Sequence, residues 1–326
     1  MTKWIDTRVL KLLAIALVLA MIPGLVLMAL GYGDGSTLTV FAAVAGLIAC
    51  VTAGWRVAAL AVTGLAVATA VVMPLAEVPW AAATVLAAVS AIVAYSSRRG
   101  IASGLMLVPI ALAFTVTDPP LDTLDYPQRA LVAALAVLGA GVFAVVATRL
   151  LVHQQLPAGD CVSQGRAALY AAIIAVLVWL ATWIVILNDL GLAGAWSVMT
   201  ILLVVQPYLQ DGWQIAMHRA VGTLVGFAIA LSFVVVSGLP VIIYASGGVF
   251  LYLAMVFKFS ARPYWQYAAL VTPAVVLLEG ASGSLDVLAW QRLVATVVAV
   301  LASLVVMLLA RPLYLAGARR HDLERW

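Results

Sequence analysis

Charged side chains are scarce in this sequence: aspartate, glutamate, lysine and arginine together make up 9% of its 326 residues. A typical soluble domain is about a quarter charged and about half apolar. Here 66% of the residues are hydrophobic, and a soluble fold has too little interior to bury that much apolar surface. The composition therefore predicts a polytopic membrane protein of the all-α class.

Cysteine and histidine are also rare. Two cysteines, Cys50 and Cys161, are too few for a disulfide framework, and His153, His218 and His321 are scattered without the spacing of a metal site. The sequence also lacks a glycine-rich phosphate loop, a nucleophile elbow and paired carboxylates on one helix. We therefore expect no enzymatic activity, no cofactor and no metal. In a membrane protein, the net charge of +4 indicates orientation rather than a nucleic-acid partner.

Long apolar runs are what the sequence does have. The first follows basic residues, as in a signal peptide, but it continues for about the 20 residues that a spanning helix needs. Breaks at glycine, proline and charge clusters separate about twelve segments. We expect transmembrane helices at residues 9–30, 37–53, 56–75, 79–95, 101–117, 128–152, 167–187, 195–209, 218–237, 240–257, 265–280 and 291–310. Several are at the short limit for a crossing, so we expect these to be the least tilted or to be partly broken.

The basic residues indicate the orientation of these helices. With twelve alternating crossings and both termini in the cytoplasm, every lysine and arginine except Arg129 and Arg292 falls on the cytoplasmic side. Most of the acidic residues fall on the other side. This distribution follows the positive-inside rule, so we expect a multi-pass protein with both termini in the cytoplasm.

The two exceptions are related by an internal repeat. QRALVAALAVL around Arg129 and QRLVATVVAVL around Arg292 lie 163 residues apart, which is half the chain. The repeat divides the chain into two six-helix membrane halves, residues 1–157 and 158–326. Because six is an even number, the halves enter the membrane in the same direction, as parallel repeats.

A shorter period occurs within each half. Arg56 precedes Arg129 by 73 residues, and Arg219 precedes Arg292 by the same distance. Each arginine is expected to open the third helix of a three-helix unit, and neighbouring units are then inverted, as in many transporters. Arginine at a helix end commonly extends to the membrane interface, so an anchor and a substrate contact both stay open. Arg129 and Arg292 oppose the positive-inside rule, which gives a functional role more weight for this pair.

Two sequence motifs resemble a known family. AWSVMTILLVVQP at 195–207, followed by HRAVGTLVG, resembles the fusaric-acid-resistance (FUSC) or aromatic acid exporter family, which shows Trp-x-x-x-Thr, Gln-Pro and then Arg-x-x-Gly-Thr-x-x-Gly. The segments at 264–278 and 291–312 are similar to later helices of that family. The resemblance covers most of residues 195–312 and reaches the first half only through the internal repeat.

This resemblance implies a transporter of the bacterial inner membrane that exports small organic anions, aromatic carboxylates in particular. The expected substrate-binding residues are Arg219, Thr223, Arg292, Thr296, Thr200, Trp196, Tyr267 and Thr272, with Arg129 and Arg56 added by the repeat. Arginine has a planar fork that fits a carboxylate, and aromatic faces fit a ring-bearing substrate. For Tyr264 and Trp265 a place in the interfacial aromatic belt is the preferred alternative.

Three function classes stay open. A proton-coupled exporter usually carries a titratable group inside the membrane, whereas Glu279, Asp118 and His218 stand at the ends of expected spans. The lack of a central acid favours an organic-anion channel or uniporter as the alternative, and a non-transporting membrane scaffold subunit is the third class. The expected partners are the anion and the lipid bilayer, while a homodimer and a periplasmic adaptor stay open.

Overall fold

The computed structural model describes residues 18, 22–27, 29–32, 35–121, 124–151, 159–236, 240–259, 263–279 and 285–316. In this part of the chain every regular element is a helix. The labelled helices are α2 (Ser36–Ala53), α3 (Trp55–Leu75), α4 (Pro79–Tyr95), η2 (Ser96–Arg99), α5 (Ala102–Leu105), α6 (Leu107–Thr117), α7 (Tyr126–Leu151), α8 (Gln164–Leu187), α9 (Gly191–Val204), α10 (Leu209–Val236), α11 (Pro240–Phe259), α12 (Tyr264–Glu279) and α13 (Leu285–Ala316).

Seven of the described helices are long and apolar enough to cross a membrane. They are α2, α3, α4 with η2, α7, α8, α10 and α13. The prediction of a polytopic α-helical membrane protein is therefore confirmed. The twelve expected crossings are not all supported by this measure, because α9 and the stretch that contains α5 and α6 are apolar but too short. The first expected span, 9–30, lies largely outside the described residues.

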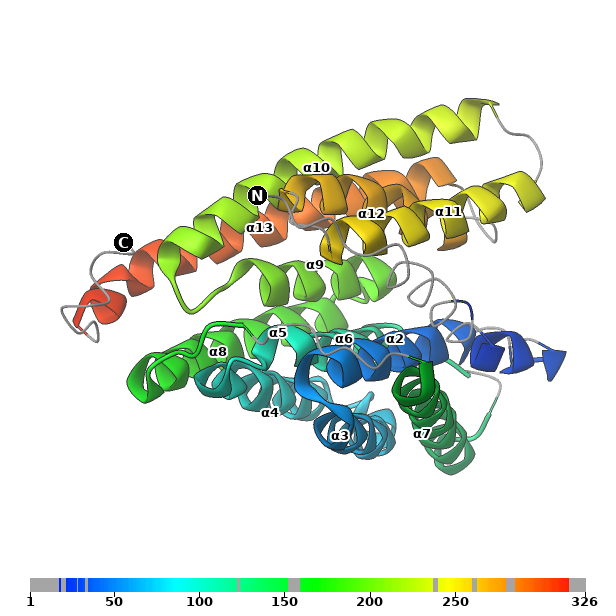
Figure 1. Cartoon of the computed structure of the whole chain (residues 1–326), viewed down its shortest axis with the longest axis horizontal. Coiled ribbons are helices and arrows are strands. Elements are labelled where there is room, and N and C mark those ends of the chain that lie inside the picture. The colour runs from blue at the N-terminus through cyan, green and yellow to red at the C-terminus, as the bar shows by residue number, and fades with distance from the viewer. Residues whose placement is uncertain are drawn as a thin grey trace.

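The helices form two groups in space (Figure 1). α10, α11, α12 and α13 lie together, α2 to α8 form the second group, and α9 lies between them. α9 packs against α6 and α8 on one side and against α10 and α13 on the other. In the first group α10 packs against α9, α12 and α13, and in the second α3 packs against α2, α6 and α7.

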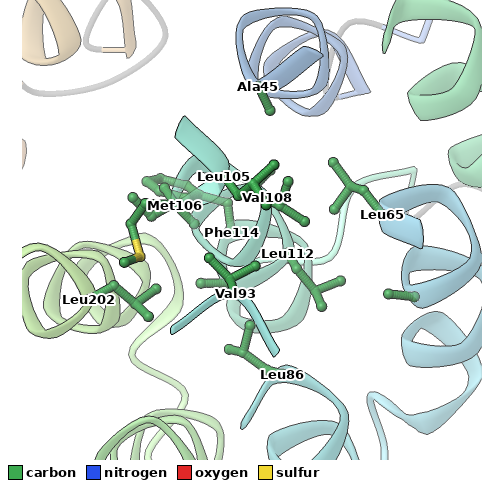
Figure 2. Close-up of a cluster of buried hydrophobic side chains, with 14 of the residues drawn as sticks. Ala45, Leu65, Leu86, Val93, Leu105, Met106, Val108, Leu112, Phe114 and Leu202 are labelled. Atoms are coloured by element: carbon green, nitrogen blue, oxygen red, sulfur yellow. The ribbon is translucent and has the colours of Figure 1, made fainter. Parts of the chain in front are cut away.

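α6 is the central helix of the second group. Every residue of α6 except Leu107 is buried, and it packs mainly against α2, α3, α4 and α9. Figure 2 shows the buried cluster at this helix: Val108, Leu112 and Phe114 of α6 itself, Leu105 and Met106 just before it, and Ala45, Leu65, Leu86, Val93 and Leu202 from the neighbouring helices. A helix that is apolar on all sides is typical of such a buried position. The helix is interrupted at Met106, between α5 and α6, so this short expected span is broken.

The expectation that each arginine opens its helix is wrong for the second half. α10 begins at Leu209, so Arg219 lies ten residues, or roughly 15 Å, inside the helix. α13 begins at Leu285, which places Arg292 two turns inside. The sequence suggested a break at Gly212, but α10 continues through this glycine, which lies against the end of the Met307 side chain of α13.

Candidate functional site

A cavity of about 1470 Å³ separates the two groups of helices. α2, α5 and α6 line one side, and α9, α10, α12 and α13 line the other. One end is formed by Ser97 and Gly100 with the link between α9 and α10, and the other end by Asp118 and the two prolines that follow it. The cavity therefore extends along the whole of α5 and α6.

Arg219 lies in the wall of this cavity on α10. Its side chain is only 2% exposed, and its Nη1 donates a hydrogen bond of 3.3 Å to the Tyr264 hydroxyl of α12. The Arg219 Nε is buried and has no acceptor among the described residues. A buried guanidinium with a donor left over is costly unless an anion or water meets it.

Arg292 lies in the same wall on α13. Its guanidinium carbon is 4.9 Å from the centroid of the Trp196 ring of α9, which is the geometry of a cation–π contact. Trp196 is fully buried, and its indole N–H has no acceptor among the described residues. The ring therefore holds the Arg292 cation with its face and presents a second unused donor at its edge.

Tyr267 connects the two arginines. Its ring centroid lies 5.6 Å from that of Tyr264, and its hydroxyl is within electrostatic range of both Arg219 and Arg292. Four of the expected site residues, Trp196, Arg219, Tyr267 and Arg292, thus line one cavity. Together they form a wall rich in hydrogen-bond donors and aromatic faces, which we call the donor wall.

The acidic residues of the cavity stand near its ends. Among the described residues, the acids that line it are Asp118, Asp160 and Asp211. The pKa of Asp118 is raised, first by partial burial and then by Asp189, while Arg129 acts in the opposite direction. The electrostatic character of the cavity is thus cationic in the donor wall and acidic at its ends.

The four expected threonines are buried but do not line the cavity. Thr200 donates to the Trp196 carbonyl at 2.8 Å and Thr272 to the Ala268 carbonyl at 2.9 Å. Such bonds to the carbonyl one turn earlier satisfy a hydroxyl within its own helix. Thr223 and Thr296 are each 2% exposed, and they too are absent from the lining.

The structure does not bring the first-half arginines to the donor wall. Arg56 is exposed and its guanidinium lies 5.5 Å from the ring of its neighbour Trp55. Arg129 is half-buried and donates to the carbonyls of Pro119 and Pro120. The sequence repeat therefore does not produce four equivalent arginine environments.

Several lining residues were not expected from the sequence. Tyr264 was assigned to the interfacial belt, but it accepts a hydrogen bond from Arg219 inside the cavity. Phe41 of α2 and Phe114 of α6 line the opposite side, with their ring centroids 4.5 Å apart. An isolated phenylalanine in an apolar helix carries no signal in the sequence, so only the packing of α2 on α6 reveals this pair.

The described residues contain no group of three or more histidine, cysteine or acidic side chains that could hold a metal ion. The cavity is lined by donors, aromatic faces and apolar surface, with three aspartates near its ends.

The comparisons with known proteins agree with the resemblance seen in the sequence. Residues 180–306 match the family described as fusaric acid resistance protein-like. No curated protein and no solved structure matches the chain. The family region includes α9 to α12 and most of α13, so it contains the whole donor wall. Together with the apolar helices, the match indicates a membrane transport or resistance protein.

Proposed function

We propose that this protein is an inner-membrane exporter of small organic anions, with aromatic carboxylates as its substrates, and that the cavity is the transport path. The observation that carries the proposal is the pair of unused donors, Arg219 Nε and the Trp196 indole N–H, in one cavity wall with two buried arginines. A ligand made of acceptors, such as a carboxylate, would satisfy both donors.

The dimensions of the cavity support a path across the membrane. The lining runs from Ala102 to Asp118 along α5 and α6, which corresponds to roughly 24 Å of helix. The hydrocarbon core of a bilayer is about 30 Å thick. A ligand bound near the donor wall would therefore lie at membrane depth, where a guanidinium attracts an anion much more strongly than it does in water.

We place this site within a twelve-helix arrangement of two parallel six-helix halves, each made of two inverted three-helix units, with both termini in the cytoplasm. The related packing of α3 and α10 supports the arrangement. α3 packs against the two flanking helices α2 and α7, and α10 packs in the same way against α9 and α13. Transporters with nested repeats place the substrate between the repeats near mid-membrane.

A channel or uniporter for organic anions is the second candidate. It is favoured by the distribution of acids, since the described acids that line the cavity stand near its ends and none is in the donor wall. Proton-coupled transport usually requires a titratable group in the path. Under the exporter proposal, Asp118, Asp160 or Asp211 would have to supply that group.

Reconstitution of the purified protein in liposomes tests the proposal. The exporter should give saturable, protein-dependent flux of labelled benzoate that changes with an imposed pH gradient. Saturable flux that is independent of the pH gradient would identify a uniporter, and unitary currents in planar bilayers would identify a channel. If protein-containing and empty liposomes give the same flux and no current, the transport proposal is wrong.

A further inference from the structure

The cavity has two chemically different walls that face each other. The donor wall carries Arg219, Arg292 and the Trp196 indole N–H. The opposite wall, from α2 and α6, contributes Phe41, Phe114 and the aliphatic side chains of Val40, Val44, Leu107 and Ile110 to the cavity. We call these six residues the apolar wall.

The apolar wall is organised around the two phenyl rings. Phe114 is 6% exposed and Phe41 is half-buried, and their centroids are 4.5 Å apart with an angle of 29° between the planes. These six side chains carry no charge and no hydroxyl, whereas Ser36, Thr37 and Thr115 line the cavity from the same two helices. The six residues therefore stabilise a ligand through the burial of apolar surface.

The cavity is also large for a small anion. Sites for drug-sized molecules usually measure about 300–1,000 Å³, and this cavity is larger, at about 1470 Å³. A small anion held at the donor wall would leave the apolar wall in contact with nothing but water. Apolar surface on the wall would then stay in contact with water, and the favourable free energy of burying it against a ligand would be lost.

We infer that the ligand is an amphipathic organic anion with two parts, and that Phe41 and Phe114 set its preferred size. The anionic group lies against Arg219 and Arg292, and an apolar body longer than a single ring lies against the phenyl pair. This inference rests on the proposed function, because it takes the cavity as the binding site. It adds that the first half of the chain selects the apolar part of the ligand and that the family region binds the charge.

A chain-length series tests this division of roles. The protein in lipid nanodiscs is titrated by calorimetry with straight-chain carboxylates from butanoate to decanoate, and binding to empty nanodiscs is subtracted. In the wild type, affinity should rise about fourfold per methylene until the cavity is filled. Arg292→Gln should weaken all chain lengths by a similar factor, because the head group is common to all. Phe41→Ala and the milder Phe114→Leu should flatten the dependence on length and leave butanoate almost unaffected.

The matched control is Ile92→Ala on α4, because Ile92 is 72% exposed and lies outside the cavity lining. It should behave as the wild type. Melting curves confirm that each variant is folded. This inference is wrong if binding depends on Arg292 but not on chain length, or if affinity still rises with chain length in both phenylalanine variants. Either result leaves the proposal of an anion-binding site at the donor wall intact. If no carboxylate binds and Arg292→Gln changes nothing, the proposed function itself fails.

A second inference concerns one end of the cavity, where residues 159–162 form a short strap. The Gly159 N–H donates to the Gly100 carbonyl at 2.8 Å, and the Val162 N–H donates to the Ser97 carbonyl at 3.2 Å. Gly100 has a φ of +71°, and a Cβ on it would clash with the Gly159 carbonyl oxygen. The strap is therefore held in backbone contact with the turn between η2 and α5.

The strap leads directly into α8, where a second contact holds this end of the cavity. Arg166 is 3% exposed, and its guanidinium carbon lies 4.5 Å from the ring centroid of Tyr208. Tyr208 belongs to the non-helical link between α9 and α10 and lines the cavity, as do Gly159 and Val162. We propose that the strap is a gate that closes this end of the transport path, and that it opens by breaking its backbone bonds to the turn.

A reversible disulfide tests the gate. An ideal Cβ on Gly159 would lie 3.5 Å from Oγ of Ser103, so cysteines at these two positions would lie within reach of each other. Ser103→Cys with Gly159→Cys in a Cys161→Ser background should therefore crosslink under mild oxidation. Flux of labelled carboxylate should then stop and should return on reduction, whereas each single cysteine variant keeps its flux. Full flux in the crosslinked protein, or failure of the pair to crosslink, overturns the gate. An absence of flux in the reduced protein points instead to failure of the proposed function.

Discussion

The guanidinium carbon of Arg292 on α13 lies 4.9 Å from the ring centroid of Trp196 on α9, and each side chain is at most 2% exposed. This contact joins two helices that are almost one hundred residues apart in the sequence. It also places the Arg292 cation, held against an aromatic face, in the wall of the cavity. The Trp196 ring is therefore expected to be important for both stability and anion binding.

Replacement of Trp196 tests this contact. Trp196→Leu should lower the free energy of unfolding by about 3 kcal/mol, since it removes the aromatic face and leaves a cavity. Trp196→Phe keeps a face and should cost about half as much. Reversible unfolding in mixed micelles measures both values. Trp80→Phe is the control, because Trp80 is 60% exposed on α4 and should cost almost nothing; equal losses at both positions would contradict the assigned role of Trp196.

Close packing of α10 on α12 makes a second prediction. A Cβ on Gly222 would lie 2.5 Å from both the Ala268 Cβ and the Trp265 carbonyl oxygen. Gly222→Ala should therefore destabilise the protein by roughly 1–3 kcal/mol, and Gly222→Leu should separate the helices and abolish transport. Gly64 in α3 has open space around a Cβ, so Gly64→Ala should instead stabilise by about 0.5–1 kcal/mol. A melting temperature that rises in both alanine variants would contradict the packing.

The raised pKa of Asp118 predicts a pH dependence of stability. Because the folded protein holds this proton more tightly than the unfolded chain, Asp118 favours folding at low pH and loses that contribution as the pH rises through its raised pKa. Asp118→Asn should remove this component and should make the protein more stable than the wild type at neutral pH. The free energy of unfolding of both proteins, measured from acidic to neutral pH, gives the contribution of Asp118. A less stable Asn variant at neutral pH would show that Arg129 dominates the environment of Asp118 instead.

The two native cysteines report on topology without any substitution. Cys161 is exposed and Cys50 is buried. A membrane-impermeant maleimide should label Cys161 in inside-out vesicles and not in intact spheroplasts, since the connector between the two halves is predicted to be cytoplasmic. Cys161→Ser should abolish the labelling. Labelling from the outside would reverse the orientation deduced from the basic residues.

The sequence predicted the class of the fold and most helix positions, because apolar runs separated by glycine and proline are local signals. It placed the starts of α10 and α13 too late. Charged and small residues near Gly212 look like a loop, yet α10 runs through them, and Gly212 packs against the end of the Met307 side chain of α13. Tertiary packing of this kind is not visible in a local pattern.

The donor wall was predicted better than the apolar wall. Arginine and tryptophan are conspicuous in an apolar sequence, so Arg219, Arg292 and Trp196 were singled out directly. The threonines shared their motifs but do not line the cavity, and Thr200 and Thr272 donate to carbonyls of their own helices. Phe41 comes into the cavity only through the packing of α2 on α6, which no spacing rule encodes.

The most direct test of the account measures anion binding and flux in arginine variants at matched expression. Arg219→Gln and Arg292→Gln should each reduce saturable carboxylate flux strongly, and Arg219→Lys should keep only part of it, because an ammonium cannot form the bidentate contact of a guanidinium. The control is Arg98→Ala, since Arg98 is exposed and donates to the Tyr95 hydroxyl at 3.0 Å; it should transport as the wild type does. Wild-type flux in Arg219→Gln and Arg292→Gln alike would contradict the claim that the donor wall binds the transported anion.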